Sequence, residues 1–68
     1  MKKFFYCSEG GRMNEIEADS ALMAYRCIFY FYMPSTKIII IDSETKQANV
    51  FIRKLDHNGN LIEIIKIF

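Results

Sequence analysis

The sequence predicts an α+β fold in which five strands form one mostly antiparallel sheet with a single helix, in the order ββαβββ. Three observations lead to this fold class. Two strand-like stretches flank Gly10-Gly11, an alanine-rich segment follows a serine, and three further strand-like stretches come after Pro34. Because the chain has 68 residues, of which 51% are hydrophobic, we expect one domain, residues 1–68, with one modest core.

The first two strands are expected at Lys3–Glu9 and Arg12–Ala18, joined by Gly10-Gly11. Two glycines suit a two-residue hairpin turn with positive φ, so that Glu9 pairs with Arg12. In this register the core face carries Phe5, Cys7, Asn14 and Ile16, and the opposite face carries Phe4, Tyr6, Ser8, Met13, Glu15 and Glu17.

A helix is expected between Ser20, or Asp19, as its N-terminal cap and Pro34, which ends it. Helical spacing gives a core-facing stripe of Ala21, Ala24, Tyr25, Ile28, Phe31 and Tyr32. The opposite side, where an ordinary solvated helix has lysine and glutamate, carries Leu22, Met23, Arg26, Phe29, Tyr30 and Met33. A strand over Cys27–Met33 is the alternative, because these residues have high β propensity.

The third strand is expected at Lys37–Asp42, whose four isoleucines are typical of the middle of a sheet. Asn49–Leu55 and Leu61–Phe68 predict a hairpin through Asn58-Gly59. Its register pairs Lys54 with Glu63, Ile52 with Ile65, Arg53 with Ile64, and Phe51 with Lys66. We expect the helix to meet the face with Val50, Ile52, Leu61, Ile65 and Ile67, and the other face to carry Phe51, Arg53, Leu55, Ile62, Ile64 and Lys66.

No pattern in the sequence predicts a catalytic residue, a cofactor or a metal site, so we expect a protein that is not an enzyme. His57, the only histidine, lies beside a tight turn that offers neither a nucleophile nor a pocket. Cys7 and Cys27 lack metal-ligand spacing and are expected to be free thiols in a reducing compartment.

The apolar runs are too short to span a membrane, which needs roughly 20 residues. We therefore expect a cytoplasmic protein without a membrane segment.

The outward side of the helix is the main functional prediction. One helix covers only one face of a sheet, so other apolar surface remains for a partner. We expect a protein partner, or a second copy in a homodimer, to bind Leu22, Met23, Arg26, Phe29, Tyr30 and Met33. The alternative is a single-stranded nucleic acid bound by Lys2, Lys3, Phe4, Tyr6, Arg53 and Lys66. A net charge of +1 gives no general attraction to phosphates.

The run IEADSALMA, Ile16–Ala24, places a strand directly before a serine-capped, alanine-rich helix. This join resembles one found in very small phage and mobile-element proteins, including several anti-CRISPR proteins. In those inhibitors a compact sheet with one helix binds a subunit of a bacterial defence complex. The resemblance covers these residues and the order of elements, and it implies a phage-type inhibitor that acts by steric occlusion. No binding residue carries over, since these inhibitors share no motif, and this chain lacks the acidic charge that many of them have.

Overall fold

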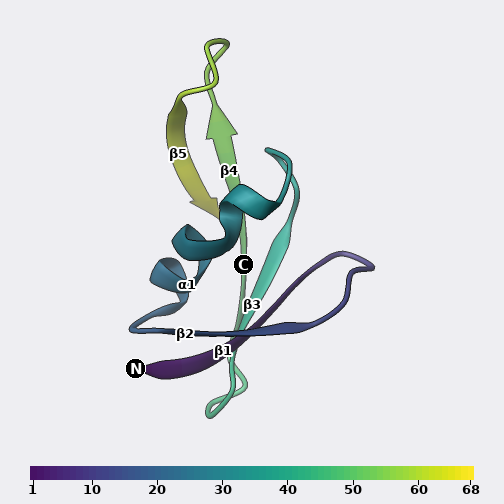
Figure 1. The fold of residues 1–68 in the computed structure, drawn as a ribbon, viewed down its shortest axis with the longest axis vertical. Coiled ribbons are helices and arrows are strands. Elements are labelled where there is room, and N and C mark those ends of the chain that lie inside the picture. The colour runs from purple at the N-terminus through teal and green to yellow at the C-terminus, as the bar shows by residue number, and fades with distance from the viewer.

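The computed structural model describes all 68 residues. The chain forms one five-stranded sheet with one α-helix (Figure 1). The elements are β1 (Lys2–Ser8), β2 (Asn14–Ala18), α1 (Ala21–Ile28), the 3₁₀ helix η1 (Phe29–Phe31), β3 (Ile38–Asp42), β4 (Ala48–Leu55) and β5 (Leu61–Lys66). The strand order in the sheet is β2-β1-β3-β4-β5, and every neighbouring pair is antiparallel. The predicted α+β class and the order ββαβββ are confirmed.

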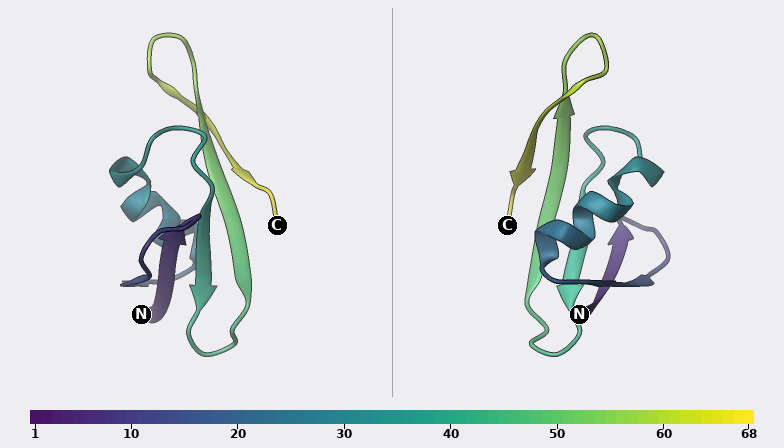
Figure 2. Two further views of the ribbon diagram at one scale, coloured as in Figure 1. Left: turned by 90° about the vertical axis from the view of Figure 1, so that its right-hand side faces the viewer. Right: turned by 60° about the vertical axis from the view of Figure 1, so that its left-hand side comes forward.

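The helix and the sheet enclose one small core. The buried side chains are Phe4, Ala18, Ala24, Tyr25, Ile28, Phe29, Ile38, Ile40 and Phe51. Figure 2 shows α1 on one side of β1 and β3, and no element covers the other side of the sheet. We call these sides the helix-covered face and the open face.

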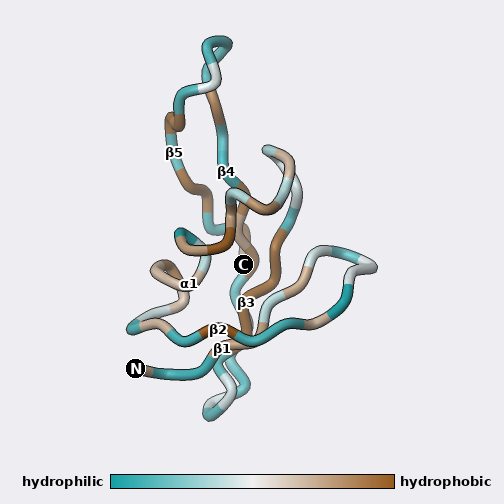
Figure 3. Tube along the Cα trace, in the orientation of Figure 1, coloured by the Kyte–Doolittle hydropathy of each residue, from teal (hydrophilic) through white to brown (hydrophobic).

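The central strand β3 divides its four isoleucines between the two faces. Ile38 and Ile40 are 1% and 0% exposed on the helix-covered face, whereas Ile39 and Ile41 are half-buried on the open face. Figure 3 shows β3 as one of the most hydrophobic segments of the chain, while the turns are hydrophilic. A strand that is apolar on both faces therefore occupies the middle of the sheet, as predicted.

The predicted register of the first hairpin is wrong by one residue. Ile16 pairs with Phe4 rather than Phe5, so that Phe4 enters the core and Phe5 lies on the open face. Residues 9–13 form the connection, which is longer than the predicted two-residue loop. It contains a β-turn closed by Gly11 N donating to Ser8 O at 2.9 Å, and only Gly10 of the two glycines has positive φ, at +75°. Since β2 resumes pairing only at Asn14, the two glycines do not fix the register.

The second hairpin has the predicted register, but its predicted faces are wrong. Ile52 pairs with Ile65 and Arg53 with Ile64, with an irregularity at Lys54/Leu55. The side that meets the core carries Phe51, which is 4% exposed, and Ile64. Phe51 pairs with the buried Ile38 of β3, and this neighbour decides which face of β4 turns inward.

The α-helix ends earlier than predicted, and the alternative of a strand over Cys27–Met33 is also wrong. Ser20 caps α1 as expected, its Oγ accepting a hydrogen bond from Met23 N at 3.2 Å. After Ile28 the chain tightens into η1, which turns each residue through a larger angle than an α-helix does. Phe29 therefore points inward, 4% exposed, and Phe31 points outward, 76% exposed, the reverse of the prediction.

Candidate protein-interaction surfaces

The outer side of α1 and η1 presents a run of apolar side chains to solvent. Tyr30, Phe31 and Met33 are 74%, 76% and 77% exposed, and Leu22 and Met23 are 44% and 47% exposed. Together with the exposed Arg26, these residues form what we call the helix patch: Leu22, Met23, Arg26, Tyr30, Phe31 and Met33. Five of the six predicted partner-binding residues thus belong to it. Phe29 does not, because it is buried, and Phe31 takes its place.

Of the four consecutive aromatic residues at the end of the helix, the outer two, Phe29 and Tyr32, turn toward the core and the middle two, Tyr30 and Phe31, turn toward solvent. The ring of Phe29 packs edge-on against Tyr25, with centroids 5.5 Å apart. Tyr30 in turn packs edge-on against Phe29 at 4.2 Å, so that an exposed ring rests on a buried one. Tyr32 turns back and is half-buried against the core. The contact with Phe29 restricts the orientations open to the Tyr30 ring.

Arg53 of β4 fastens the end of the helix to the sheet. Its guanidinium lies 5.1 Å from the centroid of the Phe29 ring, and Nη2 donates to Tyr32 O at 2.8 Å. Burial raises the pKa of Tyr25, an effect that the positive charge of Arg53 partly offsets. Burial also raises the pKa of Tyr32. These contacts fix the backbone from which the exposed residues of the helix patch project.

A groove lies between the start of α1 and the strands β4 and β5. It has a volume of about 380 Å³ and is lined by Ser20, Ala21, Leu22, Asn49, Phe51, Ile64 and Lys66. Leu22 belongs to both the groove and the helix patch, so the two surfaces are continuous. The groove is mostly apolar, and an aliphatic or aromatic side chain is the kind of group that it fits.

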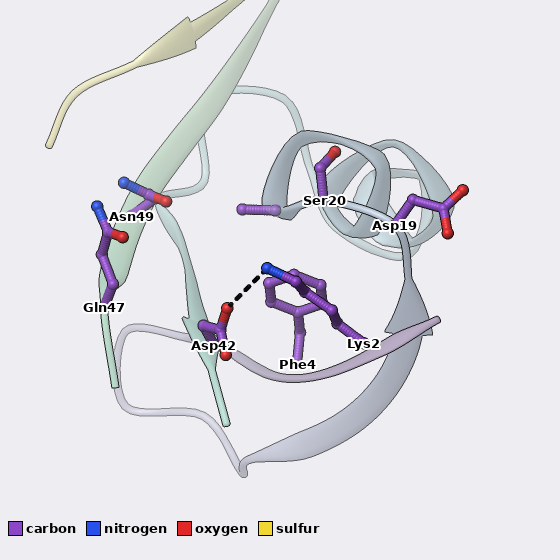
Figure 4. A pocket seen from close by; sticks show the side chains of 8 residues that line it. Lys2, Phe4, Asp19, Ser20, Asp42, Gln47 and Asn49 are labelled. Carbon is purple, nitrogen blue, oxygen red and sulfur yellow. Dashed lines mark ion pairs between the residues drawn. The ribbon is translucent and has the colours of Figure 1, made fainter. Parts of the chain in front are cut away.

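A smaller and more polar hollow of about 200 Å³, drawn in Figure 4, shares Ser20, Ala21 and Asn49 with this groove. Lys2 Nζ and Asp42 Oδ2 lie 3.7 Å apart at its mouth, and Phe4 forms part of its wall. The backbone N–H groups of Glu44 and Thr45 donate to Asp42 and lower the pKa of its carboxyl group, with a smaller effect from Lys2. The carboxylate of Asp42 thus holds a turn together rather than standing ready as a base.

The open face of the sheet carries a second apolar surface, which we call the sheet patch. The strand registers place on it Phe5, Cys7, Ile39, Ile41, Ala48, Val50, Ile52, Ile65 and Ile67. All are half-buried except Ile67, which is 48% exposed. The sequence indicated that one face would stay uncovered but assigned Ile52 and Ile65 to the wrong one. Ile39 and Ile41 were absent from the predicted sites, although their alternation with Ile38 and Ile40 could have shown them.

The residues predicted for nucleic-acid binding do not form one surface. Phe4 is 2% exposed, so its ring cannot stack on a base. Lys2 and Lys3 are neighbours in a strand and point to opposite faces of the sheet. Arg53 is engaged by Phe29 and Tyr32 O. Tyr6 is half-buried on the helix-covered face, and Lys66 lies apart at the wall of the apolar groove.

Comparison with known proteins identifies no relative: no family model, no curated protein and no solved structure matches the chain. Neither α1 nor η1 has the length and apolar character needed to cross a membrane.

Proposed function

We propose that this chain is a small protein-interaction module without catalytic activity, which binds a partner protein through the helix patch. One observation carries the proposal: Tyr30, Phe31 and Met33 expose about three quarters of their surface at and just after the end of the helix. Tyrosine, phenylalanine, methionine and arginine are enriched where protein interfaces are most tightly packed. Hiding about 300 Å² of such surface from water contributes about 7 kcal/mol before the costs of association.

The geometry of the patch supports binding by a largely preformed surface. Tyr30 rests on the buried ring of Phe29, and Arg53 holds the backbone that follows. Less conformational freedom is therefore lost when a partner covers Tyr30 than if its side chain moved freely. The groove beside Leu22 would accept an apolar side chain of the partner.

We further propose that the partner is a subunit of a bacterial defence complex and that the chain inhibits it by steric occlusion. The resemblance of Ile16–Ala24 and of the element order to anti-CRISPR proteins supports this choice. A compact domain with exposed rings on one side suits occlusion, since it needs only to bind and block. Such an inhibitor acts inside the host cell, where the partner complex is found.

A capture experiment tests the binding proposal. The tagged chain is immobilised, exposed to lysate from a bacterium with an active CRISPR system, and compared with two variants. Tyr30→Ala removes an exposed ring from the helix patch, whereas Met13→Ala removes an apolar side chain, 52% exposed, outside the patch. We expect a protein retained by the wild type and by Met13→Ala but lost with Tyr30→Ala. Equal capture by both variants, or none by the wild type, contradicts the proposal.

A phage challenge tests the inhibitor proposal separately. Cells whose CRISPR system targets a phage are infected with and without expression of the chain. We expect the chain to restore plaque formation and Tyr30→Ala to lose that effect at equal protein level. A chain that captures a partner but never restores plaques would leave the interaction module standing and remove the defence-complex assignment.

A further inference from the structure

The sheet patch is a second candidate surface, on the opposite side of the sheet from the helix patch. Its members lie in adjacent rows across four strands: Phe5 beside Ile41 and Ala48, Cys7 beside Ile39 and Val50, and Ile52 beside Ile65. All nine of its side chains are apolar. Such a surface does not require a partner with hydrogen-bonding groups at fixed positions. Another apolar sheet face can cover it.

We propose that the sheet patch is covered by the sheet patch of a second copy of this chain, in a twofold-symmetric dimer with two sheets packed face to face. This inference goes beyond the function proposed above, because it concerns a different surface and leaves the helix patch free. In such a dimer the helices lie on the two outer sides and the open faces form a second core between them.

Shape and charge favour a second copy as the occupant. Sheets rich in β-branched side chains stack on one another with side chains interdigitated, so an open face of isoleucine and valine is complementary to itself. Charged residues lie only at the margin of the patch, where Lys3 and Lys54 are balanced by Glu15, Glu17 and Glu63. The net charge of the whole chain is +1. Two copies therefore approach without appreciable repulsion.

The area of the patch sets the expected strength of the dimer. Nine apolar side chains at these exposures present on the order of 300–400 Å², the size of the largest apolar patch on a typical monomer. With the charged margin included, two copies bury about 1,200 Å² in total, which lies at the lower limit for specific interfaces. We therefore expect a reversible dimer with a dissociation constant in the micromolar range.

The two free cysteines provide a test that needs no mutation. Cys7 lies within the sheet patch, whereas Cys27 is exposed on α1. Labelling by a small thiol reagent is followed by mass spectrometry of each cysteine peptide, from about 1 μM to about 1 mM protein. We expect the labelling of Cys7 to slow at least fivefold over this range while that of Cys27 stays constant. Light scattering over the same range should show the mass rising from monomer to dimer.

A matched pair of substitutions at two exposed isoleucines, one at each end of β5, completes the test. Ile67→Lys places a charge in the sheet patch at a residue that is 48% exposed, and Ile62→Lys makes the same change outside it at one that is 56% exposed. We expect Ile67→Lys to raise the dissociation constant at least tenfold and Ile62→Lys to leave it unchanged. A monomer at every concentration overturns the proposal, and so does a dimer that protects Cys27 instead of Cys7 or that survives Ile67→Lys.

Discussion

Replacing Arg53 with alanine tests the claim that the helix patch projects from a fixed backbone. The substitution removes the hydrogen bond from Nη2 to Tyr32 O, at 2.8 Å, and the contact with the Phe29 ring, at 5.1 Å. A hydrogen bond to a charged group contributes about 1.5–3 kcal/mol, and a partly exposed cation–π contact contributes about 0.5–1 kcal/mol. Because Arg53 is only half-buried, the lower ends apply, and we expect the free energy of unfolding to fall by about 2 kcal/mol.

Urea unfolding followed by far-UV circular dichroism measures this loss. For a domain of this size the slope is about 1 kcal/mol per M, so the midpoint should fall by about 2 M. Lys54→Ala is the matched control, since Lys54 is the next residue of β4 and is exposed, and its midpoint should not move. A loss below about 0.5 kcal/mol for Arg53→Ala, or an equal loss in Lys54→Ala, would refute the role given to Arg53.

The same variant should loosen the segment that follows η1. Without the bond to Tyr32 O, the backbone between Tyr32 and Lys37 has fewer contacts with the sheet. We expect chymotrypsin to cleave Arg53→Ala after Tyr32 or Phe31 several times faster than it cleaves the wild type under native conditions. An unchanged cleavage pattern would show that other contacts hold this segment.

Three smaller effects follow from the turns and the helix cap. Ser20→Ala should lower the free energy of unfolding by about 1 kcal/mol and Ser20→Asp should largely preserve it, as measured by urea unfolding. Gly59→Ala should cost about 1 kcal/mol by the same measurement, because Gly59 has φ +86°. The pKa values of Asp42 and Asp56 are lowered in the folded protein, chiefly by backbone N–H donors of Glu44 and Asn60 respectively. Stability from these carboxylates is present above their ordinary pKa of 3.8 and is lost as pH falls through the lowered values, so acid unfolding should begin at higher pH in Asp42→Asn.

The order of elements was predictable because each element has a local cause. Ser20 caps the helix, Asn58-Gly59 makes a tight turn, and the isoleucines of β3 favour the middle of a sheet. These features depend on residues close together in the chain, and sequence patterns describe them well. The second hairpin reaches its predicted register by a different route: its loop, residues 57–59, is one residue longer than the predicted turn, and the irregularity at Lys54/Leu55 compensates for the extra residue.

The faces of the strands could not be assigned in the same way. In β1 both Phe4 and Phe5 are large and apolar, so hydrophobic pattern alone accepts either register, and a longer turn than expected decided it. In β4 the inward face was set by the pairing of Phe51 with Ile38, two residues from different parts of the chain. Where both faces of a strand are apolar, only the neighbouring strand shows which one the helix covers.

The candidate site was predicted in outline and wrong in one detail. Helical spacing correctly predicted that Leu22, Met23 and Arg26 are exposed on the outer side of the helix. Beyond Ile28 the chain turns more tightly than an α-helix, so the α-helical spacing no longer shows which residues face the core. In this tighter turn Phe29 contacts Tyr25 and Arg53. Such a change depends on tertiary contacts and leaves no trace in the periodicity.

Both proposed interactions depend on a sheet whose single helix leaves the opposite apolar face uncovered, and the four isoleucines of β3 test this most directly. Their methyl groups can be observed by NMR at low protein concentration in the presence of a soluble paramagnetic agent. We predict strong relaxation enhancement for Ile39 and Ile41 and little for Ile38 and Ile40, which are 1% and 0% exposed. Equal protection of all four isoleucines in a monomer would contradict the account.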